Sequence, residues 1–396
     1  MGTCASHDVN GSRHRLWKRS VEHETPRLID GTAFTPSSAA AAAAAAAPDT
    51  RASGTVALHC VAYSSFLDGD CLTGWDDGSI QRLQWRSKTP TRDTVLSVWI
   101  PHAAAVTQLV LGAKLQMMYS SSLDKTVAIT PITDRPASET TTVLRGHQLS
   151  VASVAVDDAE QLLCSGGRDT QTIFWDLTTS HIAAKTTTPA NVVTCSTWLP
   201  GEALVAQGSE DLSVKLWDPR TPLHAPAQAF RGFLHCPQSI AASGSGDATK
   251  DSTYLLTSSR GSNKGVGGEL RVWDRRTGTQ VVEFEGGDQD ATACCFLPTT
   301  AAGQSTIEGG MESSQRLPLP VTASMDGTVK VWDASSLSPL AKAGAEGAPK
   351  CTITSLCTVD KSTLLASTIS GQVFAYSLDW EHRTLAWQPR GECTSS

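Results

Sequence analysis

One short motif recurs along this chain, and the repetition constrains the fold more than any other feature of the sequence. Four segments end in Trp-Asp, with their tryptophans at Trp175, Trp217, Trp273 and Trp332. Three of these segments carry an aspartate six residues before the tryptophan, at Asp169, Asp211 and Asp326. Each aspartate lies between two runs that favour strands, which predicts two strands joined by a tight turn.

Weaker copies of the motif extend the repeat in both directions. They contain Asp77 in WDDGSI, Asp124 in SLDKTVAI and Ser370 in TISGQVFAY, where the acid is missing. Successive aspartates up to Asp211 are 47, 45 and 42 residues apart, but the step to Asp326 is 115 residues. One turn is therefore hidden in that interval, in the segment ending at Trp273, where the glycine-rich loop 260–268 replaces it. Seven units result, and they predict one domain.

A repeat of about 40 to 45 residues with a Gly-His lead and a Trp-Asp end resembles the WD40 family, with four strands to a blade. The resemblance covers roughly residues 54–390. It implies an all-β fold: a single seven-bladed β-propeller over residues 52–390, preceded by a disordered leader, 1–51. The expected blades are 54–89, 95–136, 143–180, 188–223, 230–280, 284–337 and 348–390.

The third unit matches the family pattern completely. By the resemblance, four of its side chains form a hydrogen-bonded chain that pins the blade edge: His147, Ser165, Asp169 and Trp175. The second unit keeps the same 22-residue spacing between His102 and Asp124 but lacks the tryptophan. The fourth unit has no histidine and carries Gln207 at the serine position. The sixth unit keeps Thr322, Asp326 and Trp332. We therefore expect uneven blade stability, highest near the third unit.

The third unit also contains the residue types of a hydrolase triad, His147, Ser165 and Asp169. A nucleophilic serine requires a sharp exposed turn and an oxyanion hole, whereas Ser165 lies in a predicted strand of a repeat that reuses the same positions. The loop 261–268 lacks the G-x-x-x-x-G-K-[ST] pattern that cradles phosphates, and no predicted helix follows it. The sequence predicts no catalytic activity and no cofactor.

Charge and cysteine content narrow the class of partner. The chain has 32 Lys and Arg against 39 Asp and Glu, a net charge of -7, so binding to nucleic acid is not expected. Its 11 cysteines show neither a C-x-x-C pair nor zinc-ligand spacing, and no secretory segment precedes them. We expect reduced thiols, a cytoplasmic location, no metal site, and a monomeric propeller that binds other proteins.

The first residues carry a sequence pattern for lipid attachment. The first six residues, MGTCAS, fit the M-G-x-x-x-[ST] pattern for myristoylation of Gly2, and Cys4 could accept a palmitoyl group. Basic residues at 13–19 would favour an anionic surface. We expect peripheral membrane attachment through this leader; the alternative is an unmodified disordered segment. Residues 20–51, with an alanine tract at 39–47, are interpreted as a flexible tether.

Function has to be sought on the two faces of the predicted ring. By the family pattern, the turns at the aspartates share one face, which would present Trp75, Asp76, Leu123, Arg168, Glu210 and Met325. The opposite face would carry two insertions rich in Gly, Ser and Thr, 241–252 and 299–319. These insertions suit either a binding site or flexible filler.

Two finer resemblances suggest different partners. Residues 191–218, followed by Gly267-Gly268-Glu269, are similar to a ciliary group of WD-repeat proteins. That likeness implies a scaffold at the cilium or its base, which acts in membrane-protein trafficking with regulators of small GTPases. Alternatively, the W-D-x-R sequences that end at Arg220 and Arg276 resemble the motif by which substrate receptors dock onto cullin-4 ubiquitin ligases.

Closure of the ring has two candidate strands. Residues 27–34 lie upstream of the first blade, and residues 383–388 follow the last unit directly. We expect the downstream strand to complete the last blade, because the alanine tract separates the upstream one from the repeat.

Overall fold

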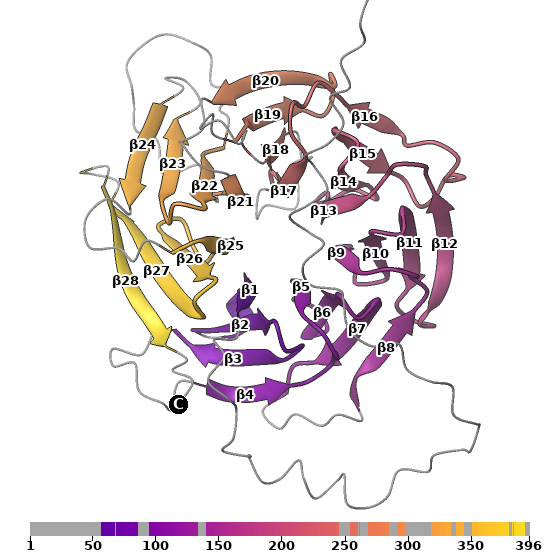
Figure 1. Ribbon diagram of the computed structural model, residues 1–396, viewed down its shortest axis with the longest axis horizontal. Helices are drawn as coiled ribbons and strands as arrows, with labels where there is room; N and C mark the ends of the chain where they lie inside the picture. The colour runs from indigo at the N-terminus through magenta and orange to yellow at the C-terminus, as the bar shows by residue number, and fades with distance from the viewer. Residues whose placement is uncertain are drawn as a thin grey trace, which may run out of the picture. The chain divides into compact units, whose positions relative to one another are not determined.

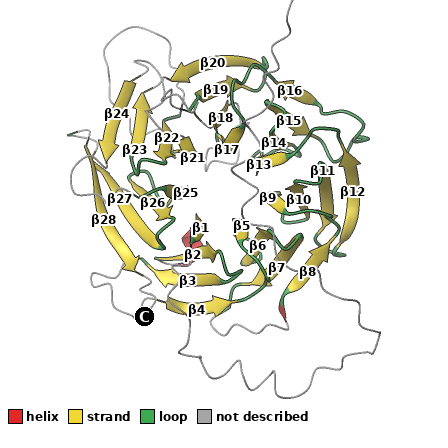
Figure 2. Cartoon of the chain, viewed as in Figure 1, coloured by secondary structure: helices red, strands yellow, loops and turns green. Residues whose placement is uncertain are grey.

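The structure is a computed structural model, and its described residues form a ring of antiparallel sheets (Figures 1 and 2). It describes residues 57–67, 69–85, 95–133, 140–244, 254–259, 261, 268–284, 291–297, 318–333, 338–343, 351–379, 382 and 384–392, without the side chains of 343 and 387–392. All of them belong to the unit Ser53–Ser396. The leader therefore lies outside the described residues, and so do Gly2 and Cys4.

The described strands form seven four-stranded sheets, which we call blades 1 to 7. Blade 1 consists of β1 (Leu58–Ala62), β2 (Asp70–Trp75), β3 (Ile80–Gln84) and β4 (Val95–Trp99), and blade 2 of β5 (Val106–Gly112), β6 (Met117–Ser122), β7 (Thr126–Pro131) and β8 (Thr142–Arg145). Blade 3 consists of β9 (Val151–Val156), β10 (Leu162–Gly167), β11 (Gln171–Asp176) and β12 (His181–Thr187). Blade 4 consists of β13 (Val193–Trp198), β14 (Val205–Ser209), β15 (Ser213–Trp217) and β16 (Gln228–Phe230). A short 3-10 helix, η1 (Ser65–Leu67), lies between β1 and β2.

Blades 5 to 7 follow the same order. They consist of β17 (Pro237–Ala242), β18 (Tyr254–Ser259), β19 (Leu270–Asp274) and β20 (Thr279–Phe284); β21 (Ala291–Phe296), β22 (Pro320–Ser324), β23 (Val329–Asp333) and β24 (Ser338–Ala343); and β25 (Ile353–Thr358), β26 (Thr363–Thr368), β27 (Gln372–Asp379) and β28 (Thr384–Glu392). The predicted all-β, seven-bladed fold is confirmed. Of the strand expected downstream at 383–388, residues 384–388 belong to β28, which pairs with β27 and completes blade 7.

The expected blade boundaries differ from the sheets by one strand. The units 95–136 and 143–180 each began with a strand that belongs to the preceding sheet, namely β4 and β8. The sequence motif marks the turn between the second and third strands of a blade, so it fixes the turn positions but not the strand at which a sheet begins.

The core is divided among the junctions between neighbouring blades, with one apolar cluster at each of the seven. The second and third strands are buried on both sides, which explains their runs of apolar and small residues, such as LLCSGG in β10. A Cβ at Gly166 in β10 would overlap Val193 of blade 4. The small residue therefore lets the two blades approach.

Threonine hydroxyls in first strands add hydrogen bonds between neighbouring blades. Thr107 Oγ1 donates to the carbonyl of Val151 at 2.7 Å, and Thr194 Oγ1 donates to that of Pro237 at 2.6 Å. At the junction of blades 7 and 1, Thr354 Oγ1 donates to the carbonyl of Leu58 at 2.9 Å. No described strand is exchanged between blades 7 and 1, so side-chain packing and this bond close the ring.

Candidate interaction faces

The four family residues of blade 3 are joined by hydrogen bonds. Trp175 Nε1 donates to Ser165 Oγ at 2.8 Å, and Ser165 Oγ lies 2.8 Å from His147 Nε2. His147 Nδ1 lies 3.0 Å from both carboxylate oxygens of Asp169. A neutral imidazole that donates from Nδ1 to the carboxylate accepts at Nε2, so the serine hydroxyl donates to it. Asp169 also accepts the backbone N–H of Gln148 at 2.7 Å, which fixes the link that enters the blade.

Blade 2 contains a shorter version of this chain. His102 Nδ1 lies 3.2 Å from Asp124 Oδ2, and its Nε2 lies 2.8 Å from Ser120 Oγ. Asp124 accepts the backbone N–H of Ala103 at 3.0 Å. Ser120 was missed in the sequence, although it precedes Asp124 by the same four residues as Ser165 precedes Asp169. Thr130 stands where blade 3 has its tryptophan.

Burial sets the charge state of both histidines. Desolvation lowers the pKa of His102 and His147 below the usual 6.5, against the opposing effect of Asp124 and Asp169. Burial alone would raise the pKa of Asp124, but hydrogen bonds from Thr126 and Ala103 outweigh it, so that this pKa is lowered. Each network therefore pairs a neutral imidazole with a carboxylate at neutral pH.

The position of Ser165 does not suit a nucleophile. Its side chain is fully buried in β10, which is paired on both sides with β9 and β11. The hydroxyl accepts from Trp175 and donates to His147, so both of its roles are structural. A substrate carbonyl could reach it only after the blade had come apart.

In blade 4 a lysine fills the role of the missing histidine. Lys215 is buried, and its ammonium group contacts Asp211, Asn191 Oδ1 at 2.7 Å and Ser213 Oγ at 2.9 Å. Burial alone would raise the pKa of Asp211, but hydrogen bonds from Lys215 and Ser213 lower it overall. The amine replaces the imidazole as the partner of the turn aspartate.

The serine position of blade 4 has no link to its tryptophan. Gln207 accepts a hydrogen bond from Thr172 of blade 3 at 2.8 Å. Within the described part of the chain, Trp217 Nε1 is buried without an acceptor. Gln207 therefore joins two blades instead of completing the chain within one.

Blade 5 replaces two members of the chain at once. Phe233 follows Arg-Gly as His147 does, and Glu269 accepts the backbone N–H of Leu234 at 3.0 Å, as Asp169 accepts that of Gln148. Arg271 Nη2 donates to Glu269 at 2.6 Å, and its guanidinium lies 5.4 Å from the centre of the Phe233 ring. The link that enters blade 5 is thus anchored by a different acid, Glu269, which directly follows the loop 260–268. Residues 260 and 262–267 of that loop lie outside the described residues.

In blades 5 and 6, threonine takes the role of Ser165 as the acceptor for the tryptophan of the Trp-Asp segment. Trp332 Nε1 donates to Thr322 Oγ1 at 2.8 Å in blade 6, and Trp273 Nε1 donates to Thr257 Oγ1 at 3.0 Å in blade 5. The turn carboxylates also stabilise the turns themselves. Asp326 accepts the backbone N–H of Thr328 at 2.8 Å, and Asp77 accepts that of Ser79 at 3.0 Å. Such bonds to the residue two positions on are typical of aspartate turns.

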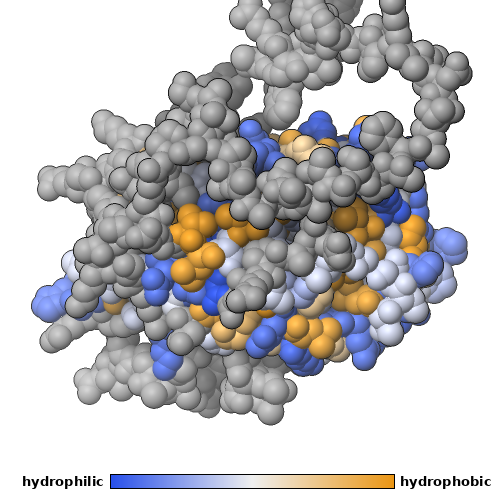
Figure 3. Space-filling model, turned by 90° about the horizontal axis from the view of Figure 1, so that it is seen from below, coloured by the Kyte–Doolittle hydropathy of each residue, from blue (hydrophilic) through white to orange (hydrophobic). Residues whose placement is uncertain are grey.

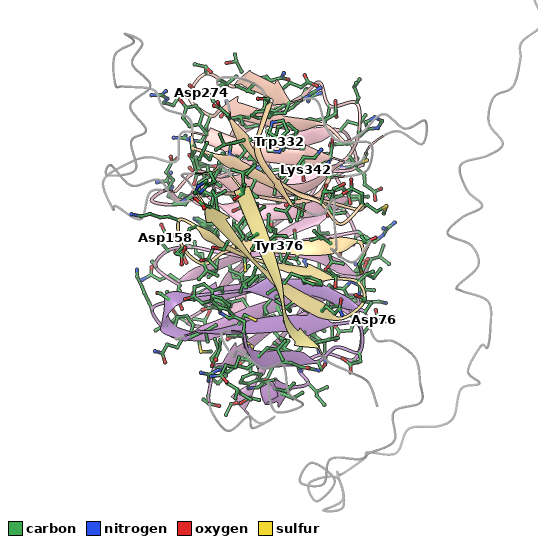
Figure 4. All side chains as sticks on the ribbon, turned by 90° about the vertical axis from the view of Figure 1, so that its left-hand side faces the viewer. Asp76, Asp158, Asp274, Trp332, Lys342 and Tyr376 are labelled. Atoms are coloured by element: carbon green, nitrogen blue, oxygen red, sulfur yellow. The ribbon has the colours of Figure 1, made fainter. Side chains whose placement is uncertain are left out.

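The aspartate turns lie on one face of the ring, which we call the turn face. Figure 4, a view from the side, shows Asp76 at this face and Asp158 and Asp274 at the other. Of the six residues predicted for the turn face, five are exposed: Asp76, Leu123, Arg168, Glu210 and Met325.

The prediction for Trp75 was wrong. This residue ends β2 with only 4% of its surface exposed, and its Nε1 donates to Thr73 Oγ1 at 3.0 Å. In WDDGS the turn begins at Asp76, so that Trp75 still has the inward orientation of the strand. It belongs to the core between blades 1 and 7.

Apolar side chains on the turn face are more numerous than the sequence motif indicated. Besides Leu123 and Met325, the exposed apolar residues in the described turns and links of this face are Ile100, Leu149, Leu212, Leu234 and Ile369. Leu149 follows His147 by two residues and Leu234 follows Phe233 by one, so both lie in the link directly after the histidine position.

The comparisons with known proteins agree with this architecture. The sequence model of the family described as "WD domain, G-beta repeat" matches residues 138–176, 182–218 and 311–333. Those segments contain the turns and tryptophans of blades 3, 4 and 6, within a ring of seven four-stranded sheets. This chain is a WD40-repeat β-propeller.

Several WD40 relatives are similar to parts of the propeller. Telomerase protein component 1 of Rattus norvegicus is 24% identical over 66% of this chain and 9% of its own length. Pre-mRNA-processing factor 19 of Bos taurus is 25% identical over 32% of this chain and 25% of its own length. Small ribosomal subunit protein RACK1y of Oryza sativa subsp. japonica is 32% identical over 39% of this chain and 42% of its own length. The chain thus spans a minor part of each of these relatives.

The opposite face of the propeller carries the W-D-x-R arginines. Arg220 donates to Asp218 through Nε at 2.9 Å and Nη2 at 2.8 Å, and 68% of its side chain is exposed. Arg276 bonds Asp274 in the same way and is also exposed. Most of both insertions, 245–252 and 299–317, lies outside the described residues.

The described part of the propeller holds no cluster of three or more His, Cys, Asp or Glu side chains that could bind a metal ion. No helix among those residues is long and apolar enough to cross a membrane.

Proposed function

We propose that this propeller is a non-enzymatic scaffold that binds other proteins through its turn face. The observation that carries the proposal is the set of exposed apolar side chains on turns and links anchored by buried hydrogen-bond networks. Apolar side chains on a rigid surface favour protein binding, because little conformational entropy is lost when a partner docks. Interaction scaffolding is also the usual role of WD40 propellers.

A matched set of variants tests the turn face. In the triple variant Leu123→Ser, Leu149→Ser and Leu234→Ser, we expect loss of the proteins that copurify with the tagged chain. Leu115→Ser is the control, because Leu115 is 60% exposed on a loop between first and second strands, at the opposite face. Quantitative mass spectrometry of the purified complexes should show partners lost only in the triple variant. Partners retained by the triple variant and lost by the control would contradict the proposal.

The finer proposal is a membrane-tethered scaffold at the cilium or its base, which works with regulators of small GTPases. Its support is the MGTCAS start and the sequence likeness over residues 191–218, and it requires Met1 to be the first residue translated. Two lipid groups, on Gly2 and Cys4, would hold the chain more firmly than one. Metabolic labelling with a myristate analogue should label the wild type and not Gly2→Ala, and imaging should place only the wild type on membranes. If the wild type and Gly2→Ala have the same location, the proposal of a membrane tether is contradicted.

The alternative proposal is a substrate receptor of a cullin-4 ubiquitin ligase. The exposed guanidinium groups of Arg220 and Arg276 favour it, because each is held in place by its own aspartate and directed to solvent. The cullin adaptor should copurify with the wild type and be lost when both arginines become alanine. Absence of the adaptor from wild-type complexes would leave the scaffold proposal alone.

A further inference from the structure

Six described turns between second and third strands place one residue in the left-handed region of the backbone. In blades 1, 6 and 7 this residue is a glycine, at Gly78, Gly327 and Gly371, with φ between 81° and 85°. Glycine adopts this conformation readily, whereas a residue with a Cβ is strained there. Glycine is therefore the least strained residue for this position of the repeat.

Blades 2, 3 and 4 have larger residues at the same position. Lys125, Thr170 and Leu212 have φ values of 73°, 63° and 62°. A positive φ is a clear outlier for a β-branched residue such as Thr170. Residues held in strained conformations cluster at functional sites. Three neighbouring blades (Figure 1) thus keep side chains on the turn face where glycine would be less strained, which points to a role for these side chains beyond the fold itself.

Exposed apolar surface alone does not mark a docking site on this propeller. Figure 3, which views the ring from below, shows hydrophobic residues scattered among hydrophilic ones on the part of that side that is not grey. Scattered apolar side chains are normal on protein surfaces. The turn face of blades 2 to 4 differs, because its exposed leucines are accompanied by basic side chains.

The turns and links of this face in blades 2 to 4, including the link to blade 5, are all described. They are residues 100–105, 123–125, 145–150, 168–170, 187–192, 210–212 and 231–236. Their leucines are Leu123, Leu149, Leu212 and Leu234, which are between 38% and 72% exposed. Each turn or link that carries one of them lies next to another in the ring, so the leucines belong to one stretch of the face.

Exposed basic side chains outnumber exposed acidic ones in these turns and links. The basic residues are Lys125, Arg145, Arg168 and Arg231, and the acidic ones are Glu210 and Asp211. Asp211 contacts the buried ammonium group of Lys215, and Glu210 lies 3.9 Å from Arg168. The turn carboxylates of blades 2 and 3 are directed inward, to buried histidines. The surface therefore presents positive charge among leucines, although the whole chain has a net charge of -7.

Charge distinguishes the possible occupants of this surface. A second copy of the chain that docked through the same face would bring like charges together, which opposes binding. The chain's own leader carries basic residues at 13–19 and does not complement the surface either. An acidic segment with apolar side chains complements both the leucines and the basic groups.

We propose that the turn face of blades 2 to 4 binds an acidic, apolar segment of a partner protein. This inference rests on the proposed scaffold function, and it names the part of the turn face and the chemistry of the segment. The leucines pack against apolar side chains of the segment, while the ammonium group of Lys125 and the guanidinium group of Arg231 attract its carboxylates. Lys125 and Leu212 occupy strained turn positions because their side chains contact the partner.

The test screens the full chain against a library of short random peptides displayed on phage. Enriched peptides should contain Asp or Glu together with Leu, Ile or Phe, and a fluorescein-labelled copy of the most enriched one should bind the wild type in fluorescence anisotropy. Raising NaCl from about 0.1 M to about 1 M should weaken this binding, because the Debye length falls from about 10 Å to about 3 Å. The proposal is overturned if no peptide is enriched or if the enriched peptides are basic or uncharged.

Charge reversal locates the binding site of that peptide. Lys125→Glu with Arg231→Glu should weaken its binding at least about tenfold. The matched control, Lys114→Glu with Lys361→Glu, reverses two exposed charges on loops between first and second strands, at the opposite face. Equal effects of the two double variants would place the peptide elsewhere and refute the proposal.

Lys125→Gly separates a contact with the partner from a structural role. The change removes the side chain and the backbone strain together, so the Tm should stay the same or rise while the peptide binds more weakly. A lower Tm with unchanged peptide binding would show that the side chain serves the fold instead.

The copurification experiment distinguishes this inference from the scaffold proposal. The triple serine variant at Leu123, Leu149 and Leu234 should lose the copurified proteins, and so should Lys125→Glu with Arg231→Glu. If only the triple variant loses them, the scaffold proposal stands and the acidic segment is refuted. If both variants keep them, both proposals fail.

Discussion

The Ser165 hydroxyl stands between two buried side chains, and each of them bonds to it. Ser165→Ala removes the acceptor of Trp175 Nε1 and the donor to His147 Nε2. Because both partners remain buried, we expect the free energy of unfolding to fall by about 1 to 3 kcal/mol. Urea denaturation measures this loss. Ser377→Ala, at an exposed position of β27, should change it by less than about 0.5 kcal/mol, and equal effects of the two variants would contradict the structural role.

The buried histidines make stability depend on pH. Burial lowers the pKa of His102 and His147 in the folded chain, whereas unfolding returns both towards 6.5. Below pH 6.5 the unfolded chain therefore binds protons that the folded chain does not. Stability is lost from about that pH downward, until the lowered folded pKa values are passed. The midpoint of urea denaturation should therefore decrease when the pH is lowered from 7.5 to 5.5.

A double variant isolates the contribution of these imidazoles. His102→Asn with His147→Asn should be less stable than the wild type at pH 7.5 and should lose less of its remaining stability on acidification. An unchanged pH dependence would assign the effect to other groups.

At the scale of single elements, blade 5 keeps its shape through the buried ion pair of Glu269 and Arg271, where blade 3 uses a neutral imidazole beside a carboxylate. Glu269→Gln keeps an acceptor for the backbone of Leu234 but leaves the buried guanidinium of Arg271 without its nearest anion. We expect a loss of about 2 kcal/mol in the free energy of unfolding. Adding Arg271→Met should restore part of it, because it removes a buried charge that would then have only the half-exposed Glu283 as its anion. A double-mutant cycle in urea measures the coupling, and additive effects would refute it.

The same blade shows where prediction from the sequence reached its limit. The turns at Asp169, Asp211 and Asp326 could be located because the same short acid recurs six residues before a tryptophan in each of these segments. Blade 5 anchors the same link with Phe233, Glu269 and Arg271. None of these three residue types belongs to the repeat motif, so the sequence did not mark them. Only their contacts identify them. Trp75 was misplaced because its neighbours resemble a turn, although its side chain follows the strand.

At the scale of the molecule, closure of the ring depends on the junction between blades 7 and 1. The apolar cluster there includes Leu58 and Trp75 from blade 1 and Leu365 and Val373 from blade 7. Thr354→Val removes the hydrogen bond from Thr354 Oγ1 to the Leu58 carbonyl and should lower the free energy of unfolding by about 1 kcal/mol. Hydrogen exchange should become faster in β1 and β25 before other first strands. Exchange that rises equally in all blades would show that this junction is not distinct.

The number of blades followed from the sequence because the units repeat at nearly constant steps. The strand that closes the ring was predicted from its position directly after the last unit. The strand at which each sheet begins could not be predicted from the sequence. A repeat has no intrinsic beginning, so only the pairing of β4 with β3 shows where blade 1 ends.

Because every blade is built from four consecutive strands, the chain can complete each sheet soon after that stretch leaves the ribosome. Contacts between neighbouring blades then form in the order of synthesis, and only the last step joins distant parts of the chain, Thr354 to Leu58. Loop-closure entropy grows slowly with length, so this late step is thermodynamically inexpensive. Until it occurs, the nascent chain is an open arc with two uncovered apolar ends, on blade 1 and on the most recent blade. Chaperones that hold hydrophobic surfaces would engage the chain during that interval, and a stalled ribosome would leave it there.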